Sequence, residues 1–453
     1  MLEKTLKNLK ETKERRKIKM NKMLRDRSGI TLVALVVTIV VLLILAGVSI
    51  SLVLDNNGII KRSKEARNKY GEAKDNEQKQ LNGVSDWIDK QVGGNGGGST
   101  ILPDETDETK PYLPSGFTKD ENTNLDNGLV IRDGASNEYV WVEVPKSIYN
   151  NANYNTETNT GDKKPANKED AEKIEYCLKK YASAYREDGY ADEYIEDSTP
   201  GWFAGKTAYD NAKKTMLASV YENGGFYVGR YEAGISEFRT SNENAPTEVP
   251  SSKQNMFPYT NITRTQAKQL AEKVNAGGRT SSLMFGIQWD LMLAFIQNKG
   301  GVDVATLTTD STNIGNYYNN KWSITNNKAK YNTDGTWNNG AYTKETESGV
   351  LLTTGASSSF AKMNIYDVAG NVFEWTLEGT PKYSSTASLQ GIKLASLVNT
   401  QISPIKMAAT DVLPPCVYRG GGYEFGTDYP ASSRNGSKVD FCVDDIGFRV
   451  SLY

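Results

Sequence analysis

The sequence predicts an α+β domain behind a long N-terminal transmembrane helix. One apolar run near the N-terminus is long enough to span a bilayer. After residue 117 the pattern changes to short strands of period two, of which 446–452 is the clearest, with two helical stretches among them. With 453 residues the chain exceeds the usual size of a single domain, so we expect more than one structural unit.

The apolar run covers Ile30–Leu54, which is 25 residues without a charge, 18 of them Leu, Ile or Val. As a helix it would measure roughly 37 Å, enough to cross a hydrocarbon layer of about 30 Å. Residues 1–29 form a basic leader: residues 1–28 hold 11 Lys and Arg against 4 Asp and Glu. Basic flanks stay in the cytoplasm, so everything after Asp55 is expected outside the cell.

Residues 55–91 predict a polar helical stalk, with apolar residues at intervals of three and four. Residues 92–116 predict a flexible linker, because GGNGGGS at 93–99 is followed by an acidic stretch that contains prolines. The domain proper is expected at 117–453.

Within that domain, Val140, Val142 and Val144 alternate with Tyr139, Trp141 and Glu143, which predicts a half-buried strand. A second strand is expected at 225–231, and helices at Thr265–Asn275 and Trp289–Gln297. The stretches Asn150–Asp170 and Asn313–Asn339 are poor in apolar residues and are predicted to be surface loops.

Composition excludes several classes of site. The chain has no histidine, which removes Ser-His-Asp and Cys-His catalysis and His-ligated metals. Its three cysteines, Cys177, Cys416 and Cys442, form no CxxC pair, and a Cys416–Cys442 disulfide stays open. The overall charge of −2, with +7 in residues 1–28, leaves −9 for the rest, so nucleic acid is not an expected partner.

The junction Arg27-Ser28-Gly29-Ile30-Thr31-Leu32 resembles a type IV prepilin cleavage site. The resemblance implies that prepilin peptidase cuts between Gly29 and Ile30, and that pilus or secretion-system subunits are partners. Pilins usually have Glu as the fifth residue after the cut, whereas this chain has Ala34. The departure favours a minor pilin or an anchored monomer over a repeating filament subunit.

A second resemblance rests on MNIYDVAGNVFEWT at 363–376, RGGGY at 419–423 and GFR at 447–449. In that order, with weaker support from 225–234 and 279–290, these blocks resemble the formylglycine-generating enzyme family over roughly residues 138–453. The resemblance implies a C-type-lectin-like fold. Trp375, Phe448, Arg419 and Arg449 are expected to be core and scaffold residues, with the two arginines buried and paired.

The family's enzymes use two cysteines between the RGG and GFR blocks. Aligned on Arg434, those positions are Gly426 and Ala431, and no cysteine lies between Val417 and Phe441. A thiolate copper site needs both ligands, so we expect no catalysis. The resemblance also implies a structural Ca²⁺ site made by side-chain oxygens of Asp367 and Glu374 and backbone carbonyls of Gly370 and Val372.

The segment Tyr423–Asp445 mixes Tyr, Phe, Asp, Asn, Ser and Gly, as antibody paratopes do. Some members of the resembled fold are variable proteins of diversity-generating retroelements, which vary at this C-terminal location. We therefore expect a surface receptor or adhesin that binds an extracellular protein or glycan. The predicted contact residues are Tyr423, Phe425, Thr427, Asp428, Tyr429, Asn435, Ser437, Val439, Asp440, Phe441, Cys442, Val443, Asp444 and Asp445. A structural pilus subunit and an oxidoreductase of the resembled family are the alternatives.

Overall fold

The structure, a computed structural model, describes residues 14–15, 100–102, 104–157, 161–186, 192, 194–379 and 416–453. The chain divides into two compact units, residues 1–76 and 77–453, and nearly all described residues belong to the second. The predicted leader, the cleavage site at Gly29–Ile30, the apolar run 30–54 and the stalk 55–91 lie outside the described residues, apart from residues 14–15. Among the described helices, none combines the length and apolar character needed to cross a bilayer.

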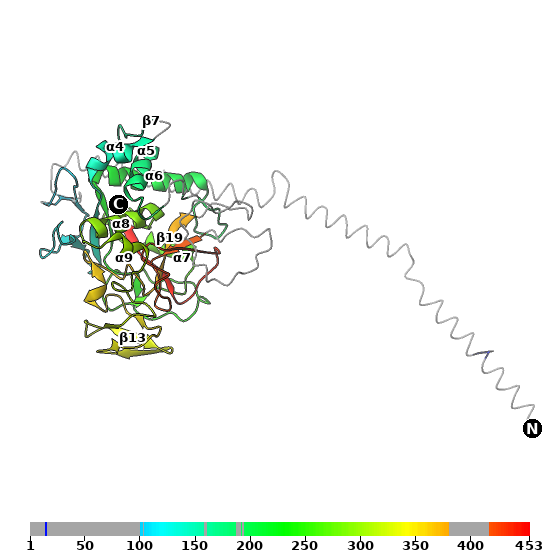
Figure 1. The fold of residues 1–453 in the computed structure, drawn as a ribbon. Helices are drawn as coiled ribbons and strands as arrows, with labels where there is room; N and C mark the ends of the chain where they lie inside the picture. Colours follow the sequence, from blue (N-terminus) through cyan, green and yellow to red (C-terminus); the bar gives the residue numbers. More distant parts are fainter. Residues whose placement is uncertain are drawn as a thin grey trace, which may run out of the picture. The chain divides into compact units, whose positions relative to one another are not determined.

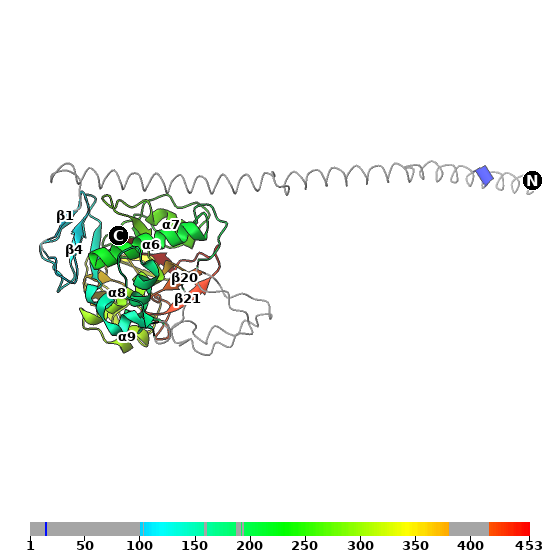
Figure 2. The ribbon, with the colours of Figure 1, turned by 90° about the horizontal axis from the view of Figure 1, so that it is seen from above.

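The second unit is a mixed α and β fold with mostly antiparallel sheets (Figures 1 and 2). Its described helices are α4 (Ala152–Asn155), α5 (Ala171–Tyr181), α6 (Lys206–Asn223), α7 (Arg264–Ala271), α8 (Gly286–Asn298) and α9 (Val304–Thr308), with 3-10 turns η1 (Lys146–Asn150) and η2 (Ser358–Phe360).

The larger sheet has six strands, antiparallel throughout, in the order β11 (Ser281–Leu283), β23 (Val450–Leu452), β8 (Gly225–Gly229), β5 (Glu138–Glu143), β4 (Val130–Arg132) and β3 (Thr118–Lys119). It therefore joins the strand predicted around Val140 to the C-terminal strand, through β8. The alternation predicted a half-buried strand at 139–144, but every residue from Tyr139 to Glu143 is buried. Both faces of this strand are covered, and α8 is one of the elements in contact with it.

The smaller sheet has four strands in the order β21 (Arg434–Ser437), β20 (Cys416–Arg419), β19 (Phe373–Gly379) and β22 (Ile446–Phe448). β22 runs parallel to β19, and the other pairs are antiparallel. The single strand predicted over Ile446–Leu452 is thus wrong, because its two halves pair in different sheets. Arg449 lies between them and bonds both sheets: its guanidinium donates to Gly229 O of β8 and to the Glu374 carboxylate of β19.

Six small ladders make up the rest of the β structure among the described residues. They are β1 (Thr100–Ile101) with β2 (Tyr112–Leu113), β6 (Thr156–Glu157) with β7 (Gly161–Asp162), β9 (Gly234–Ile235) with β10 (Phe257–Pro258), β12 (Trp322–Ser323) with β15 (Thr343–Lys344), β17 (Ala361–Lys362) with β18 (Ile365–Tyr366), and the three-stranded β14 (Thr336–Asn339), β13 (Lys330–Thr333) and β16 (Leu351–Leu352).

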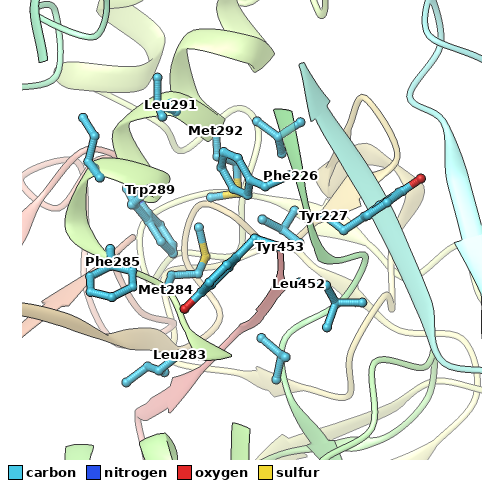
Figure 3. Packing of buried hydrophobic residues seen from close by; sticks show 14 of the residues in the cluster. Phe226, Tyr227, Leu283, Met284, Phe285, Trp289, Leu291, Met292, Leu452 and Tyr453 are labelled. Carbon is cyan, nitrogen blue, oxygen red and sulfur yellow. The ribbon is translucent and has the colours of Figure 1, made fainter. Parts of the chain in front are cut away.

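The main core gathers α8, β8 and the C-terminal strand (Figure 3). α8 is apolar on all sides and is buried from Gly286 to Ile296, which is why the sequence predicted it strongly. α7 begins where predicted because Thr263 and Gln266 form a reciprocal capping box. Helices α5 and α6 were not predicted.

Part of the expected linker 92–116 is folded. Tyr112 is only 2% exposed, lies edge-on to Trp141 and Tyr227, and donates from its hydroxyl to Leu452 O. The domain therefore begins before residue 117. An aromatic side chain buried on folding outweighs the flexibility that the local composition suggests.

The prediction that Asn313–Asn339 is a surface loop is also wrong, because the segment contains β-strands. It belongs to a larger segment, residues 312–360, that we call the insert module. Its strands β12–β16 enclose a separate apolar cluster of Trp322, Ala329, Val350, Leu352, Ala356 and Phe360. β13 lies at the end of the domain opposite α4–α6 (Figure 1). The stretch Asn150–Asp170 is mostly exposed where it is described, as predicted, but it contains α4 and the β6–β7 ladder and is not a loop throughout.

Candidate ligand-binding surface

The segment Tyr423–Asp445 leaves β20 through three glycines. Gly421 has φ +90°, and a Cβ there would lie 2.4 Å from Tyr429 O and 2.8 Å from the Tyr317 ring. Only glycine lets the chain fold back this closely on itself. The Tyr317 hydroxyl fixes the resulting loop, because it lies within hydrogen-bonding distance of two carbonyl acceptors, Gly420 O and Tyr429 O.

The middle of the segment is buried. Residues 430–435 are all buried, and Arg434 enters an ion-pair network beneath them. Asp290 of α8 accepts from Arg186, Arg419 and Arg434 at 2.6–2.7 Å. Glu378 of β19 accepts from Arg419 at 3.0 Å and from Arg434 at 2.7 Å. We call Arg434 with these four partners the clamp.

The clamp's side chains are at most 2% exposed. Burial, followed by the neighbouring Arg434, lowers the pKa of Arg419. Two carboxylates shared among three guanidiniums compensate that desolvation. Removing one partner of such a group typically costs about 3–5 kcal/mol. The prediction that Arg419 and Arg449 are buried and paired is confirmed, and Trp375 and Phe448 lie in the core as expected.

The two flanks of the segment reach the surface. We call residues 424–429 and 436–445 the arms. In the first arm Phe425 and Tyr429 lie 4.7 Å apart between ring centroids, and both contact Phe373 edge-on. Tyr418 of β20 also contacts this ring edge-on. In the second arm Val439, Phe441 and Val443 are partly exposed and pack against the main core.

The arms are also acidic. Glu424, Asp428, Asp440 and Asp444 are exposed, and Lys438 is the exposed cation among residues 423–445. Burial raises the pKa of Asp445 to about 7, and the nearby Asp444 and Glu424 carboxylates add to the effect. The surface therefore combines aromatic rings with negative charge.

Twelve of the fourteen predicted contact residues are partly or fully exposed on these arms. Tyr423 and Asn435 are the two exceptions, each 8% exposed, and the prediction for them is corrected. Tyr423 packs with Leu351 and Val372 in a small cluster. Asn435 faces Tyr418 across the β20–β21 ladder. Composition alone could not show that strand pairing buries Asn435, or that Tyr423 packs against Leu351 and Val372.

Sequence reasoning missed one aromatic at this surface. Tyr318 is 41% exposed, and its backbone N–H donates to Phe425 O at 2.8 Å. Lys344 holds this stretch by donating to Tyr318 O and Ser348 O. Two adjacent tyrosines in a polar insertion could have indicated a contact surface, but nothing in the sequence placed them beside residue 425.

Arg449 pairs with Glu374, one of the expected Ca²⁺ ligands. Both Glu374 carboxylate oxygens accept from Arg449, at 2.7 and 3.1 Å. Asp367 Oδ2 accepts from Gly355 N, and its side chain is buried. Among the described residues, no group of three or more Asp, Glu, Cys or His could hold a metal ion. Arg449 places a positive charge beside Glu374, and Gly370 and Asn371 both have positive φ.

The three cysteines are free, so the structure contains no Cys416–Cys442 disulfide. Cys416 is buried, and burial raises the pKa of its thiol to about 11. Cys442 is partly exposed on the second arm.

No protein-family model matches the chain, and no curated protein matches it. Among solved structures, the chain is similar to Treponema denticola variable protein 1, with 15% sequence identity and a TM-score of 0.22. The match covers 50% of this chain and 95% of that one. A TM-score this low is too weak to support a conclusion about fold or function.

Proposed function

We propose that residues 100–453 form a C-type-lectin-like ligand-binding domain of the formylglycine-generating enzyme type, and that the arms bind an extracellular macromolecule. The observation that supports this is the exposed aromatic and acidic surface over the clamp. Exposed aromatic rings contribute much of the binding energy at interfaces, and packing on Phe373 fixes Phe425 and Tyr429 without a ligand.

The charge of the arms favours a protein over a neutral glycan. Five carboxylates face one exposed cation, so a partner with Lys or Arg groups would be electrostatically complementary. Proteins supply such groups commonly. Catalysis is not part of the proposal, because the chain lacks histidine and lacks the cysteine pair of the resembled enzymes.

A binding screen tests the proposal. The full-length chain is presented on beads to arrays of bacterial and host surface proteins and glycans. Phe425→Ala/Tyr429→Ala is expected to lower binding at least tenfold. Tyr154→Ala/Tyr176→Ala, which removes two partly exposed tyrosines of α4 and α5, serves as the matched control. Binding that is equal in all three proteins contradicts the proposal.

The variable-protein part of the proposal has a separate test in the neighbouring DNA. A near-copy of the codons for residues 423–453, mismatched only at adenines, is expected beside a reverse transcriptase gene. If the near-copy and the reverse transcriptase gene are both absent, the variable-protein part of the proposal is wrong. The proposed binding at the arms is unaffected by that result.

Surface display follows from the sequence of residues 1–54. We propose that Ile30–Leu54 spans the bacterial membrane and leaves the domain outside. N-terminal sequencing tests the cut between Gly29 and Ile30. Loss of filaments when the gene is deleted would favour the pilus-subunit alternative.

A further inference from the structure

The insert module contains a surface pocket of about 300 Å³ that the proposed binding surface does not use. It is lined by residues of 312–325 and 357–360. Its volume falls at the lower end of the range of small-molecule sites, roughly 300–1,000 Å³. It has room for one or two sugar rings.

The lining is rich in neutral hydrogen-bonding groups. Seven of its ten residues carry a hydroxyl or an amide, and none carries a carboxylate. Hydroxyls and amides both donate and accept, as a ligand with many hydroxyls requires. A divalent cation would need several carboxylate or carbonyl oxygens, and an apolar ligand would leave most of this lining unpaired.

Trp322 provides an observation of a different kind. It lines the pocket and is 7% exposed, and its indole Nε1 is buried without a hydrogen-bond partner among the described residues. Indole N–H can only donate, and buried donors in native proteins nearly always have an acceptor. A ligand hydroxyl would satisfy this donor.

The two aromatic residues of the lining discriminate between ligand classes. Trp322 and Phe360 lie edge-on to each other, 6.0 Å apart, and Phe360 is 3% exposed. Neither offers the open ring face that a nucleobase needs for stacking. As lining residues they supply apolar contact for the C–H groups of a sugar ring.

The pocket's charge argues against a phosphate. Lys321 is its one cation, and its ammonium lies 3.8 Å from the Glu345 carboxylate, with both side chains about 70% exposed. A bound phosphate requires stronger positive charge than one solvated and partly neutralised lysine provides.

We propose that this pocket binds a neutral pyranose saccharide, independently of the arms, with a hydroxyl accepting from Trp322 Nε1. The site is separate from the aromatic surface, although both involve the stretch 317–322. Its ligand class differs from the cationic protein expected at the arms.

Saturation-transfer NMR on the full-length chain, in a detergent without a sugar headgroup, tests the proposal. The probes are the methyl pyranosides of glucose, mannose, galactose, N-acetylglucosamine, fucose and xylose, which differ in their substituents at C2, C4 and C5. At least one is expected to bind saturably with a Kd of about 1 mM, the level typical of a ligand of about a dozen non-hydrogen atoms.

Two variants assign the signal to the pocket. Trp322→Phe keeps an aromatic ring and removes the N–H, and is expected to weaken binding about fivefold. Asn313→Trp places a large side chain at an exposed position of the lining and is expected to abolish binding. Asn327→Trp makes the same exchange at an exposed site of the module outside the lining, and should bind as the wild type does.

Three outcomes would overturn the proposal. One is the absence of saturable binding by all six pyranosides. Another is binding that Asn313→Trp leaves unchanged. The third is binding of inorganic phosphate, lost on Lys321→Ala, in place of any pyranoside. Because none of these experiments involves residues 424–429 or 436–445, their failure leaves the proposed function at the arms unaffected.

Discussion

The segment Tyr423–Asp445 contains two regions with opposite properties. Its middle, residues 430–435, is buried and tied by Arg434 to Asp290 and Glu378. Its arms are partly exposed and are fixed mainly by ring packing on Phe373 and by the main core. The difference shows how one segment can combine a fixed backbone with surface side chains that tolerate substitution. Substitutions in the arms remove few buried contacts, whereas a change at Arg434 leaves buried charges without a partner.

The largest effect is expected at the clamp. Arg434→Met keeps much of the side-chain volume but removes the ion pairs to Asp290 and Glu378, which should cost about 3–5 kcal/mol in unfolding free energy. Urea denaturation of the full-length protein measures this loss. Lys438→Met, an exposed cation on the neighbouring arm, should change it by less than about 0.5 kcal/mol. Similar values for the two variants would contradict the distinction between clamp and arms.

An intermediate effect is expected where the first arm packs on the sheet. Phe425→Ala removes an edge-on contact to Phe373 and a tilted ring contact to Tyr429, from a side chain that is already partly exposed. We expect a loss of about 1–2 kcal/mol, below the cost of a fully buried Phe. Phe373→Ala, at a residue that is 2% exposed, should cost about 3–5 kcal/mol in the same urea experiment. A loss at Phe425 as large as that at Phe373 would show that the arm is part of the core.

A smaller effect is expected from pH. The pKa of Asp445 is raised to about 7 in the folded protein, from an ordinary 3.8, by burial and by Asp444 and Glu424. Between these values the folded state binds a proton that the unfolded state does not, so stability rises as the pH falls from 7 toward 4. Asp445→Asn should stabilise the protein at pH 7.5 and raise Tm by about 2–4 °C. At pH 4.5 the gain should vanish. A gain that is independent of pH would contradict this account.

The smallest effect is expected from calcium. Arg449 already neutralises Glu374, so neither 1 mM (about physiological) Ca²⁺ nor a chelator should move Tm by more than about 1 °C. Thermal unfolding with each additive is the measurement. Arg449→Ala is the informative variant, because it leaves Glu374 and Asp367 buried without their cation. If Ca²⁺ raised Tm of the wild-type protein by several degrees, the result would support a Ca²⁺ site made by the expected ligands.

Local patterns predicted those parts of the fold that depend on neighbours in the chain. The apolar patterns of Thr265–Asn275 and Trp289–Gln297 marked two helices, α7 and α8. The mixture of aromatic and small polar residues marked the exposed arms. These predictions succeeded because hydrophobic periodicity acts over a few residues, whereas α5 and α6 were not predicted.

Pairings between distant residues were decided only by the tertiary structure. The sequence contains Arg434, Asp290 and Glu378, but it does not show that they meet, nor that Ile446–Leu452 divides between two sheets at Arg449. It suggested Ca²⁺ beside Glu374, where the fold places a guanidinium. The physical reason is that burial and charge compensation depend on which side chains are brought together. That outcome belongs to the whole packed domain and cannot be read from any one segment.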